Sequence, residues 1–504
     1  MATPAEKLAT SLEALAEACR DGRTVLRARD LGRTHRERLT AAGFLQDVVK
    51  GWYYRTRPDQ INGESTSWYV AFWDFCAQYL TLRFGKDWCL APEQSLQWHA
   101  GDRTIPRQLL VRSPRGDNSV LALPFDTSLL SLRAAIPATQ DMVQDEGMRL
   151  MSIPAALTTL PPDFYANHPL ESQTALARIT HASELLPPLL ERGQTTVAGR
   201  LIGAFRAIGR EETADDIAKA MRAAGHDVRV SDPFTSPPEV MLQEANASPQ
   251  VQRLRLLWNA MRRDVIDNFP APPPSRPDPE AYLLAVEEAY VSDAYHSLSI
   301  EGYQVSRELI ERVRRNEWNP DAREADCRLR DAMAAKGYWL AFQNVKRSVA
   351  RVLAGENAGA AAADDHGDWY RELFAPSVQA GILGAAELAG YRNGPVFIRL
   401  SRHVPPSPHA VRELMPAFFE LLQGEEHPAV RVVLGHFFFV NIHPYMDGNG
   451  RVGRFLMNVM AAAGGYPWLV VPVEQRGEYL GALEEASVEG RIVGLAKLLA
   501  SLRP

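Results

Sequence analysis

One short stretch of the sequence collects the residue types that phosphoryl and nucleotidyl transfer require. Within twelve residues it holds an imidazole, a carboxylate, an asparagine between two glycines, and two guanidinium groups: His443, Asp447, Gly448, Asn449, Gly450, Arg451 and Arg454. A carboxylate beside phosphate-binding groups commonly holds Mg²⁺, because the nucleotide supplies further oxygen ligands. The stretch therefore predicts a site for a nucleotide and a magnesium ion, with a histidine that takes a proton from an attacking hydroxyl.

Two predicted helices position this stretch. Residues 430–440 are apolar on nearly every side, which indicates a buried helix. Pro444 ends it, because the residue before a proline avoids helical geometry. Gly448 and Gly450 permit positive φ angles, so that backbone N–H groups converge on one anion-binding concavity. The next helix adds its N-terminal N–H groups, with Arg451 and Arg454 on one face beside them.

The stretch HPYMDGNGRVGR resembles the active-site signature of Fic-domain proteins, HPFx[DE]GNGRxxR, with Tyr445 in place of phenylalanine. Most of these enzymes transfer AMP from ATP to hydroxyl side chains of target proteins. Gly450 and Arg454 favour this branch over the kinase-like Doc branch, which has lysine for the second glycine and lacks the last arginine. The resemblance extends over roughly residues 281–504 and implies an all-helical domain with a small β-hairpin flap.

The resemblance also implies roles for single residues. His443 is the expected general base, Asp447 the Mg²⁺ ligand and Arg454 the group that grips the γ-phosphate of ATP. Asn449 and Arg451 are expected to act in catalysis with His443. The other expected nucleotide contacts are Gly448, Asn449, Gly450, Arg451 and Tyr479, the last on the family's nucleoside-side helix. The flap corresponds to Pro395–Leu400, a segment with strand character, and would hold the target through Val396, Phe397 and Ile398.

A built-in brake is implied by a second motif. Ser297, Glu301 and Gly302 match the inhibitory motif [ST]xxxE[GN] of many Fic proteins, on a predicted helix at residues 281–302. In those proteins the glutamate pairs with the last arginine of the signature, here Arg454, and removes the γ-phosphate clamp. The resemblance implies a self-inhibited enzyme and leaves open whether the glutamate also assists removal of AMP.

Residues 5–55 show a helix–helix–hairpin order, which is typical of a winged helix-turn-helix. The segment resembles the start of abortive-infection type IV antitoxins, which bind DNA at their own promoters. The residues expected to contact DNA phosphates are Arg33, Arg36, Arg38 and Lys50. A solvated, charged helix face is the other interpretation of this pattern.

The sequence divides into five predicted regions, and the expected fold class is mainly α. They are a winged helix-turn-helix at 1–60, an antitoxin-like α+β region at 61–160, a helical region at 161–267, a proline-rich linker at 268–280 and the Fic domain at 281–504. Within the last region, the alanine-rich residues 358–363 are predicted to form a loop.

Composition excludes several classes of protein. Of 504 residues, 46% are apolar and 23% charged, which is ordinary for a folded globular chain and not for a fibrous or disordered one. The formal charge of −6 restricts any nucleic-acid contact to a local patch. No apolar stretch reaches the roughly 20 residues that span a bilayer, and no secretory signal is recognised, so we expect a cytoplasmic protein without membrane contact.

Three functional hypotheses follow from these observations. The first is a self-inhibited enzyme that uses ATP and Mg²⁺ to transfer AMP to a Tyr, Thr or Ser hydroxyl of a target protein and of itself. The second is a DNA-binding regulator or toxin–antitoxin-type protein whose Fic domain senses nucleotide. The third is a Fic fold that transfers another nucleotide or a phosphocholine. The sequence leaves a homodimer open.

Overall fold

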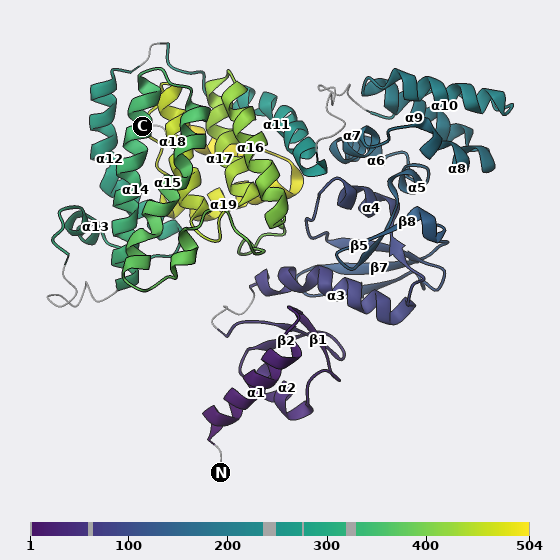
Figure 1. Cartoon of the computed structure of the whole chain (residues 1–504), viewed down its shortest axis with the longest axis horizontal. Coiled ribbons are helices and arrows are strands. Elements are labelled where there is room, and N and C mark those ends of the chain that lie inside the picture. The colour runs from purple at the N-terminus through teal and green to yellow at the C-terminus, as the bar shows by residue number, and fades with distance from the viewer. Residues whose placement is uncertain (1–2, 59–63, 235–247, 275–276, 319–328, 503–504) are drawn as a thin grey trace. The chain divides into compact units, whose positions relative to one another are not determined.

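The computed structural model describes residues 3–58, 64–234, 248–274, 277–318 and 329–502. The chain forms two compact units (Figure 1). The first unit comprises Met1–Pro249 together with Phe397–Val404, and the second comprises Gln250–Val396 together with Pro405–Pro504. Helices dominate the described residues, so the mainly α fold class is confirmed.

The first unit begins with a small helix–strand–helix–hairpin region. Its elements are α1 (Pro4–Ala18), β1 (Val25–Arg27), α2 (Arg33–Ala41), β2 (Leu45–Val49) and β3 (Trp52–Arg55). The antiparallel sheet has the order β1-β3-β2. Helix α1 starts at a reciprocal capping box between Thr3 and Glu6, which satisfies two N–H groups that lack helical partners. The apolar side chains of both helices meet in one small core that includes Leu15 and Leu39.

A mixed α/β layer follows in the same unit. It contains α3 (Thr66–Phe84), β4 (Cys89–Leu90), α4 (Pro92–His99), β5 (Gln108–Ser113), β6 (Ser119–Ala122), β7 (Ser128–Arg133), η1 (Thr139–Asp141), β8 (Met142–Asp145) and β9 (Met148–Met151). The larger sheet has the order β4-β5-β7-β6, with β5 and β7 parallel. Helix α3 lies beside this sheet (Figure 1). Most of its aromatic residues are buried, with Trp68 and Phe72 in one core with Leu109 and Leu129.

Short helices complete the first unit. They are α5 (Ile153–Leu157), α6 (Phe164–Asn167), α7 (Pro169–Ala177), η2 (Ala182–Glu184), α8 (Leu186–Glu191), α9 (Thr195–Ala207) and α10 (Glu211–Ala223). Gly199 and Gly203 lie one turn apart on α9. A Cβ atom at either position would lie 2.0 Å from the carbonyl oxygen of Arg229 or Ser231, so both glycines allow the following chain to cross α9 closely.

The second unit is a helical bundle. It contains α11 (Pro249–Asn268), α12 (Pro279–Ile300), α13 (Arg307–Arg314), α14 (Leu329–Leu353), α15 (Ala358–Gln379), η4 (Ala385–Leu388), α16 (Pro408–Gly424), α17 (Pro428–Ile442), α18 (Asn449–Ala463), η5 (Val473–Gln475), α19 (Arg476–Glu489) and α20 (Val493–Ser501). Helix α14 packs against α12, α15 and α18, and α17 packs against α18 (Figure 1). None of the helices in the described ranges is long and apolar enough to cross a membrane.

The loop predicted at residues 358–363 is wrong, because these residues form the first turns of α15. Asn357 caps the helix by accepting a hydrogen bond from the Ala360 N–H at 3.0 Å. A Cβ atom at Gly359 would lie 2.6 Å from the backbone nitrogen of Gln423. The small residues therefore allow α15 to pack closely against the end of α16. Alanine also has a high helix propensity, so the same residues favour a helix here.

The strand character predicted for Pro395–Leu400 is not seen, because the described backbone there is irregular. Within its part that groups with the first unit, the Leu400 N–H donates to Thr66 Oγ1 at 3.0 Å. Just after it, the carbonyl oxygen of Arg402 accepts from the Ile105 N–H at 2.9 Å.

Candidate active site

The turn between α17 and α18 begins at His443, as the sequence predicts. His443 ends α17 with φ +54° and ψ +60°, a left-handed conformation rather than the extended one that a following proline favours. Nδ1 of His443 lies 3.1 Å from the carbonyl oxygen of Val440. A carbonyl oxygen only accepts, so Nδ1 is the donor in this contact, and Nε2 is the nitrogen left to accept a proton.

Hydrogen bonds and packing within the turn stabilise its backbone. The side chain of Asn449 accepts from the Tyr445 N–H and donates to the Tyr445 carbonyl oxygen, both at 2.9 Å. The Tyr445 ring stacks on Tyr370 with a centroid distance of 3.9 Å, so the residue that departs from the family signature packs in the core. Gly448 has φ +80°, and a Cβ atom there would lie 2.7 Å from the Phe374 ring. The asparagine and the glycine thus fix the backbone of the concavity.

Arg451 lies buried beside the turn, with 1% of its surface exposed. Its guanidinium lies between two rings, 4.9 Å from the Phe374 centroid and 5.2 Å from that of Tyr303. Nη2 is 3.4 Å from Asp447 Oδ2, and Nε has no hydrogen-bond partner among the described residues. A buried donor without a partner is costly, so an anion with several oxygens would be bound favourably here.

The surroundings of Asp447 fit a magnesium site of the kind that a nucleotide completes. Its side chain is 65% exposed, and Oδ1 accepts from the Gly448 N–H at 2.6 Å. The described part of the chain holds no group of three or more metal-ligating side chains. Mg²⁺ is typically held by one or two carboxylates together with phosphate oxygens and water. One exposed carboxylate beside a buried guanidinium matches that donor set.

Arg454 is buried and joins α18 to the end of α12. Nε donates to Ser297 Oγ at 2.9 Å, and Nη2 donates to the Ser297 carbonyl oxygen at 3.1 Å and to Glu301 Oε1 at 2.8 Å. Gly302, with φ +87°, turns the chain after α12. The surrounding protein raises the pKa of the Glu301 carboxyl by excluding water, but the charges of Arg454 and Arg451 hold that pKa below its usual value. Glu301 is therefore ionised at neutral pH.

The Glu301 carboxylate also lies over the glycine turn. A Cβ atom at Gly450 would lie 2.2 Å from Glu301 Oε1 and 3.1 Å from Arg454 Nη1. The carboxylate is thus placed at the N-terminal end of α18, where unpaired N–H groups and the helix dipole favour an anion. The structure brings together the motif around Glu301 and the motif around His443, although about 140 residues separate them in the sequence.

Tyr479 is buried and interacts with Arg454. Its hydroxyl lies 2.8 Å from Nε2 of His436, a fully buried histidine on α17 that sequence reasoning missed. Burial lowers the pKa of His436 to about 4, so the ring is neutral at physiological pH. Phe374 and Tyr303, which flank Arg451, were also missed, because neither lies near the signature in the sequence.

The predicted flap residues do not all group with the site. Val396 belongs to the second unit, whereas Phe397–Val404 groups with the first, where Arg399 forms an ion pair with Glu64 at 3.0 Å. Phe397 and Ile398 therefore lie on the segment that the first unit holds.

The four residues predicted to bind DNA differ in exposure and in their hydrogen-bond partners. Arg36 donates to the carbonyl oxygens of Ala28 and Leu31, and Arg38 donates to the Lys7 carbonyl oxygen at 2.7 Å. Arg33 is exposed but ion-paired with Glu37 at 2.7 Å, and Lys50 is exposed in the hairpin turn. Two of the four are therefore committed to the fold of this region.

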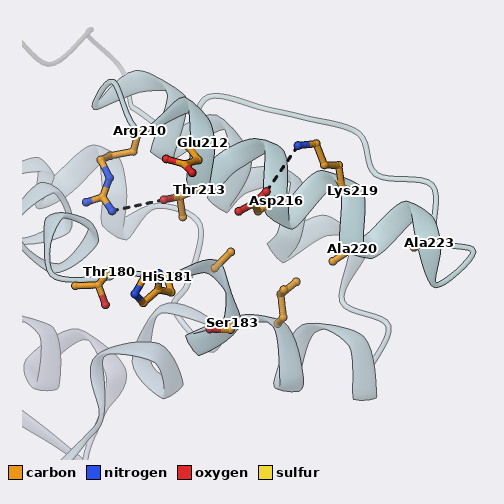
Figure 2. Close-up of a pocket in the computed structure, with 12 residues that line it drawn as sticks. Thr180, His181, Ser183, Arg210, Glu212, Thr213, Asp216, Lys219, Ala220 and Ala223 are labelled. Atoms are coloured by element: carbon orange, nitrogen blue, oxygen red, sulfur yellow. Dashed lines mark hydrogen bonds and ion pairs between the residues drawn. The ribbon is translucent and has the colours of Figure 1, made fainter.

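A hollow of about 710 Å³ lies in the first unit between η2, α8 and α10 (Figure 2). Its cations Arg210 and Lys219 are paired within the protein. Arg210 donates to the carbonyl oxygen of Ile179 at 2.9 Å, and Lys219 lies 3.7 Å from Asp216. In contrast to the turn around Gly450, this hollow offers no buried cation to a ligand.

Comparison with known proteins locates the family resemblance mainly in the second unit. Residues 363–461 match the model of the Fic/DOC family. The chain is 29% identical over 224 residues to the protein adenylyltransferases Fic of Drosophila grimshawi and Drosophila mojavensis. The match covers 44% of this chain and 42% and 41% of those relatives, so the chain spans about two-fifths of their length.

Solved structures give a weaker likeness. Fic-1 from C. elegans is 18% identical with a TM-score of 0.37, covering 66% of this chain and 94% of that chain. The sequence match carries the assignment, together with a signature from His443 to Arg454 that departs from the family pattern only at Tyr445. The C-terminal region of this chain carries a Fic domain.

Proposed function

We propose that this protein is a self-inhibited protein adenylyltransferase that transfers AMP from ATP to a Ser, Thr or Tyr hydroxyl of a target protein and of itself. One observation carries the proposal. A carboxylate from α12 occupies the anion position over the glycine turn and pairs with Arg454, while His443 begins the same turn. The printed name of the curated relatives supports AMP as the transferred group.

The proposed step uses the groups of the turn in order. Nε2 of His443 accepts the proton of the target hydroxyl, whose oxygen forms a bond to the α-phosphorus of ATP. The bond from that phosphorus to its bridging oxygen breaks, and pyrophosphate leaves. The helix N-terminus and Arg451 stabilise the charge on the phosphate oxygens. Mg²⁺ held by Asp447 would neutralise further charge on the leaving group.

The proposed inhibition follows from the position of Glu301. Its carboxylate takes the donors of Arg454 that would otherwise hold the γ-phosphate, and its negative charge lies where phosphate oxygens must bind. ATP then lacks the geometry in which the α-phosphorus faces the attacking oxygen.

Replacement of Glu301 by glycine tests both parts of the proposal. We expect Glu301→Gly to label itself and lysate proteins with radioactive ATP at least about tenfold faster than the wild type, which corresponds to about 1.4 kcal/mol of barrier. Glu426→Gly, at an exposed glutamate outside the site, is the matched control, and His443→Ala in the Glu301→Gly background is the blank. Labelling that persists in the His443→Ala blank would contradict the mechanism.

The order of elements in residues 4–55 supports a winged-helix region as a second, separate proposal. Arg33 and Lys50 are the exposed cations that would contact DNA phosphates. In a gel-shift assay with the protein's own promoter, we expect the Arg33→Ala/Lys50→Ala variant to bind DNA more weakly than the wild type. Added salt should weaken DNA binding steeply, because phosphate contacts release counterions.

A further inference from the structure

Arg392 is a buried arginine that bonds to three separate backbone segments of the second unit. Only 2% of its surface is exposed. Nε donates to the carbonyl oxygen of His443 at 2.8 Å, Nη1 donates to that of Gly394 at 3.1 Å, and Nη2 donates to that of Pro406. Its own N–H donates to the carbonyl oxygen of Pro444 at 2.9 Å.

The charge of Arg392 is balanced by carbonyl dipoles. Burial lowers the pKa of Arg392 to about 10, so the guanidinium stays protonated at neutral pH. The described residues contribute no carboxylate in a hydrogen bond or ion pair with it. A buried cation without a counter-charge is costly, and the rigid fork of a guanidinium is needed to reach three carbonyls at once. A lysine would keep the charge but lose this simultaneous geometry.

The bond to His443 acts on a strained residue. A left-handed conformation is unfavourable for a residue other than glycine, because it brings Cβ close to the following carbonyl oxygen. The Arg392 Nε–H fixes the direction of the His443 carbonyl, and the Arg392 N–H fixes that of the next residue, Pro444. Together these bonds oppose relaxation of the His443 backbone, which would move the imidazole away from the glycine turn.

We propose that Arg392 is a positioning residue for the catalytic base, and that it couples the conformation of His443 to both ends of the segment Phe397–Val404. The inference rests on the proposed function, because that function makes His443 the base. Gly394 precedes this segment and Pro406 follows it, and Arg392 bonds to both of them and to His443. If either end of the segment moves, Arg392 must shift or lose a hydrogen bond, and its bond to His443 changes as well. His443 therefore keeps its position only while both ends of the segment keep theirs.

The test compares two Arg392 variants in the Glu301→Gly background. Arg392→Lys keeps the charge, and Arg392→Met removes it at similar length. Arg262→Lys is the matched control, because Arg262 lies in the same unit and bonds to Glu425 away from the turn. The measurements are kcat and KM for ATP in self-labelling, and hydrogen exchange of peptides that cover residues 393–407, 443–447 and 450–463.

We expect both Arg392 variants to lower kcat by about 10- to 100-fold with KM for ATP within about threefold, because a misplaced base leaves the phosphate site intact. Exchange should rise together in residues 393–407 and 443–447 and stay unchanged in 450–463. The Arg262→Lys control should leave all these quantities unchanged.

Three results would overturn the inference. They are an unchanged kcat in Arg392→Lys, exchange that rises in only one of the two segments, or exchange that rises throughout α18 with loss of ATP binding. If Arg392→Met does not fold, Arg392→Lys decides. If the Glu301→Gly parent transfers no AMP, the proposed function fails, and the exchange measurement alone still decides whether Arg392 couples the two segments.

Discussion

Gly450 shows how one missing methyl group shapes the anion site. A Cβ atom at this position would lie 2.2 Å from the Glu301 carboxylate and 3.1 Å from the Arg454 guanidinium, closer than ordinary van der Waals contact. The same space must receive phosphate oxygens when Glu301 withdraws. Glycine is therefore required here for room.

A Gly450→Ala substitution in the Glu301→Gly background should weaken ATP binding by about tenfold or more, because a lost hydrogen bond to a charged group is worth about 1.5–3 kcal/mol. Isothermal titration calorimetry with ATP measures the effect. Gly477→Ala is the control, since a Cβ atom there meets nothing within 4 Å. Equal ATP affinity in the Gly450→Ala variant and this control would show that the phosphates lie elsewhere.

Asp293 is a buried carboxyl one turn before Ser297 on α12. It accepts a hydrogen bond from the Tyr338 hydroxyl at 2.6 Å. Burial raises the pKa of Asp293 from 3.8 to about 6, although the bond from Tyr338 opposes the shift. Between these two pH values the folded protein binds more protons at this site than the unfolded chain. Its contribution to the free energy of unfolding therefore falls as pH rises through this window.

In an Asp293→Asn variant, the unfolding free energy should lack this dependence on pH, because asparagine does not titrate. The difference in unfolding free energy, variant minus wild type, is expected to increase between pH 3.8 and about 6 and to level off above it. Urea denaturation at several pH values measures it. A difference that is constant over this window would contradict the assigned burial of the carboxyl.

At the scale of elements, α15 packs so closely against the end of α16 that one of its positions must be glycine. A Cβ atom at Gly359 would overlap the backbone at the end of α16, whereas one at Gly367 on the same helix would meet only the flexible end of Arg371 at 3.7 Å. Gly359→Ala should destabilise the protein by about 1–3 kcal/mol. Gly367→Ala should stabilise it by about 0.5–1 kcal/mol, because alanine favours helix. Urea denaturation of the two variants compares them, and a stabilised Gly359→Ala variant would refute the packing.

The sequence predicts helices well where an apolar periodicity has clear stops. Helix α17 ends at His443, and α12 covers Pro279–Ile300 where 281–302 was predicted. It fails at residues 358–363, where alanine and glycine resemble a loop but serve contact with α16. It also fails at Pro395–Leu400, where β-branched residues indicate a strand but no partner strand is present among the described residues. Both errors concern contacts with distant parts of the chain.

The same reason limits prediction of the site. The residues from His443 to Arg454 form one motif with a recognisable spacing, so their proximity follows from the sequence alone. Three residues of the site lie outside that motif: Phe374 on α15, Arg392 in the loop between η4 and α16, and His436 on α17. Only the packing of these elements brings them to the motif. No local pattern marks such residues.

At the scale of the whole molecule, the proposed active site and most of the family match lie in the second unit. The family model covers residues 363–461, while Ser297 and Glu301, which we propose to be inhibitory, lie at the end of α12 outside that range. Of the flap residues that the family resemblance assigns to target binding, Phe397 and Ile398 group with the first unit and Val396 groups with the second.

The central claim is that the turn from His443 to Arg454 binds a triphosphate once Glu301 is removed. A crystal structure of Glu301→Gly with a non-hydrolysable ATP analogue tests it most directly. We predict phosphate oxygens over Gly450 at the start of α18, the γ-phosphate on Arg454, and Nε2 of His443 facing the α-phosphorus. A nucleotide bound elsewhere, or an imidazole turned away from the α-phosphorus, would contradict the account.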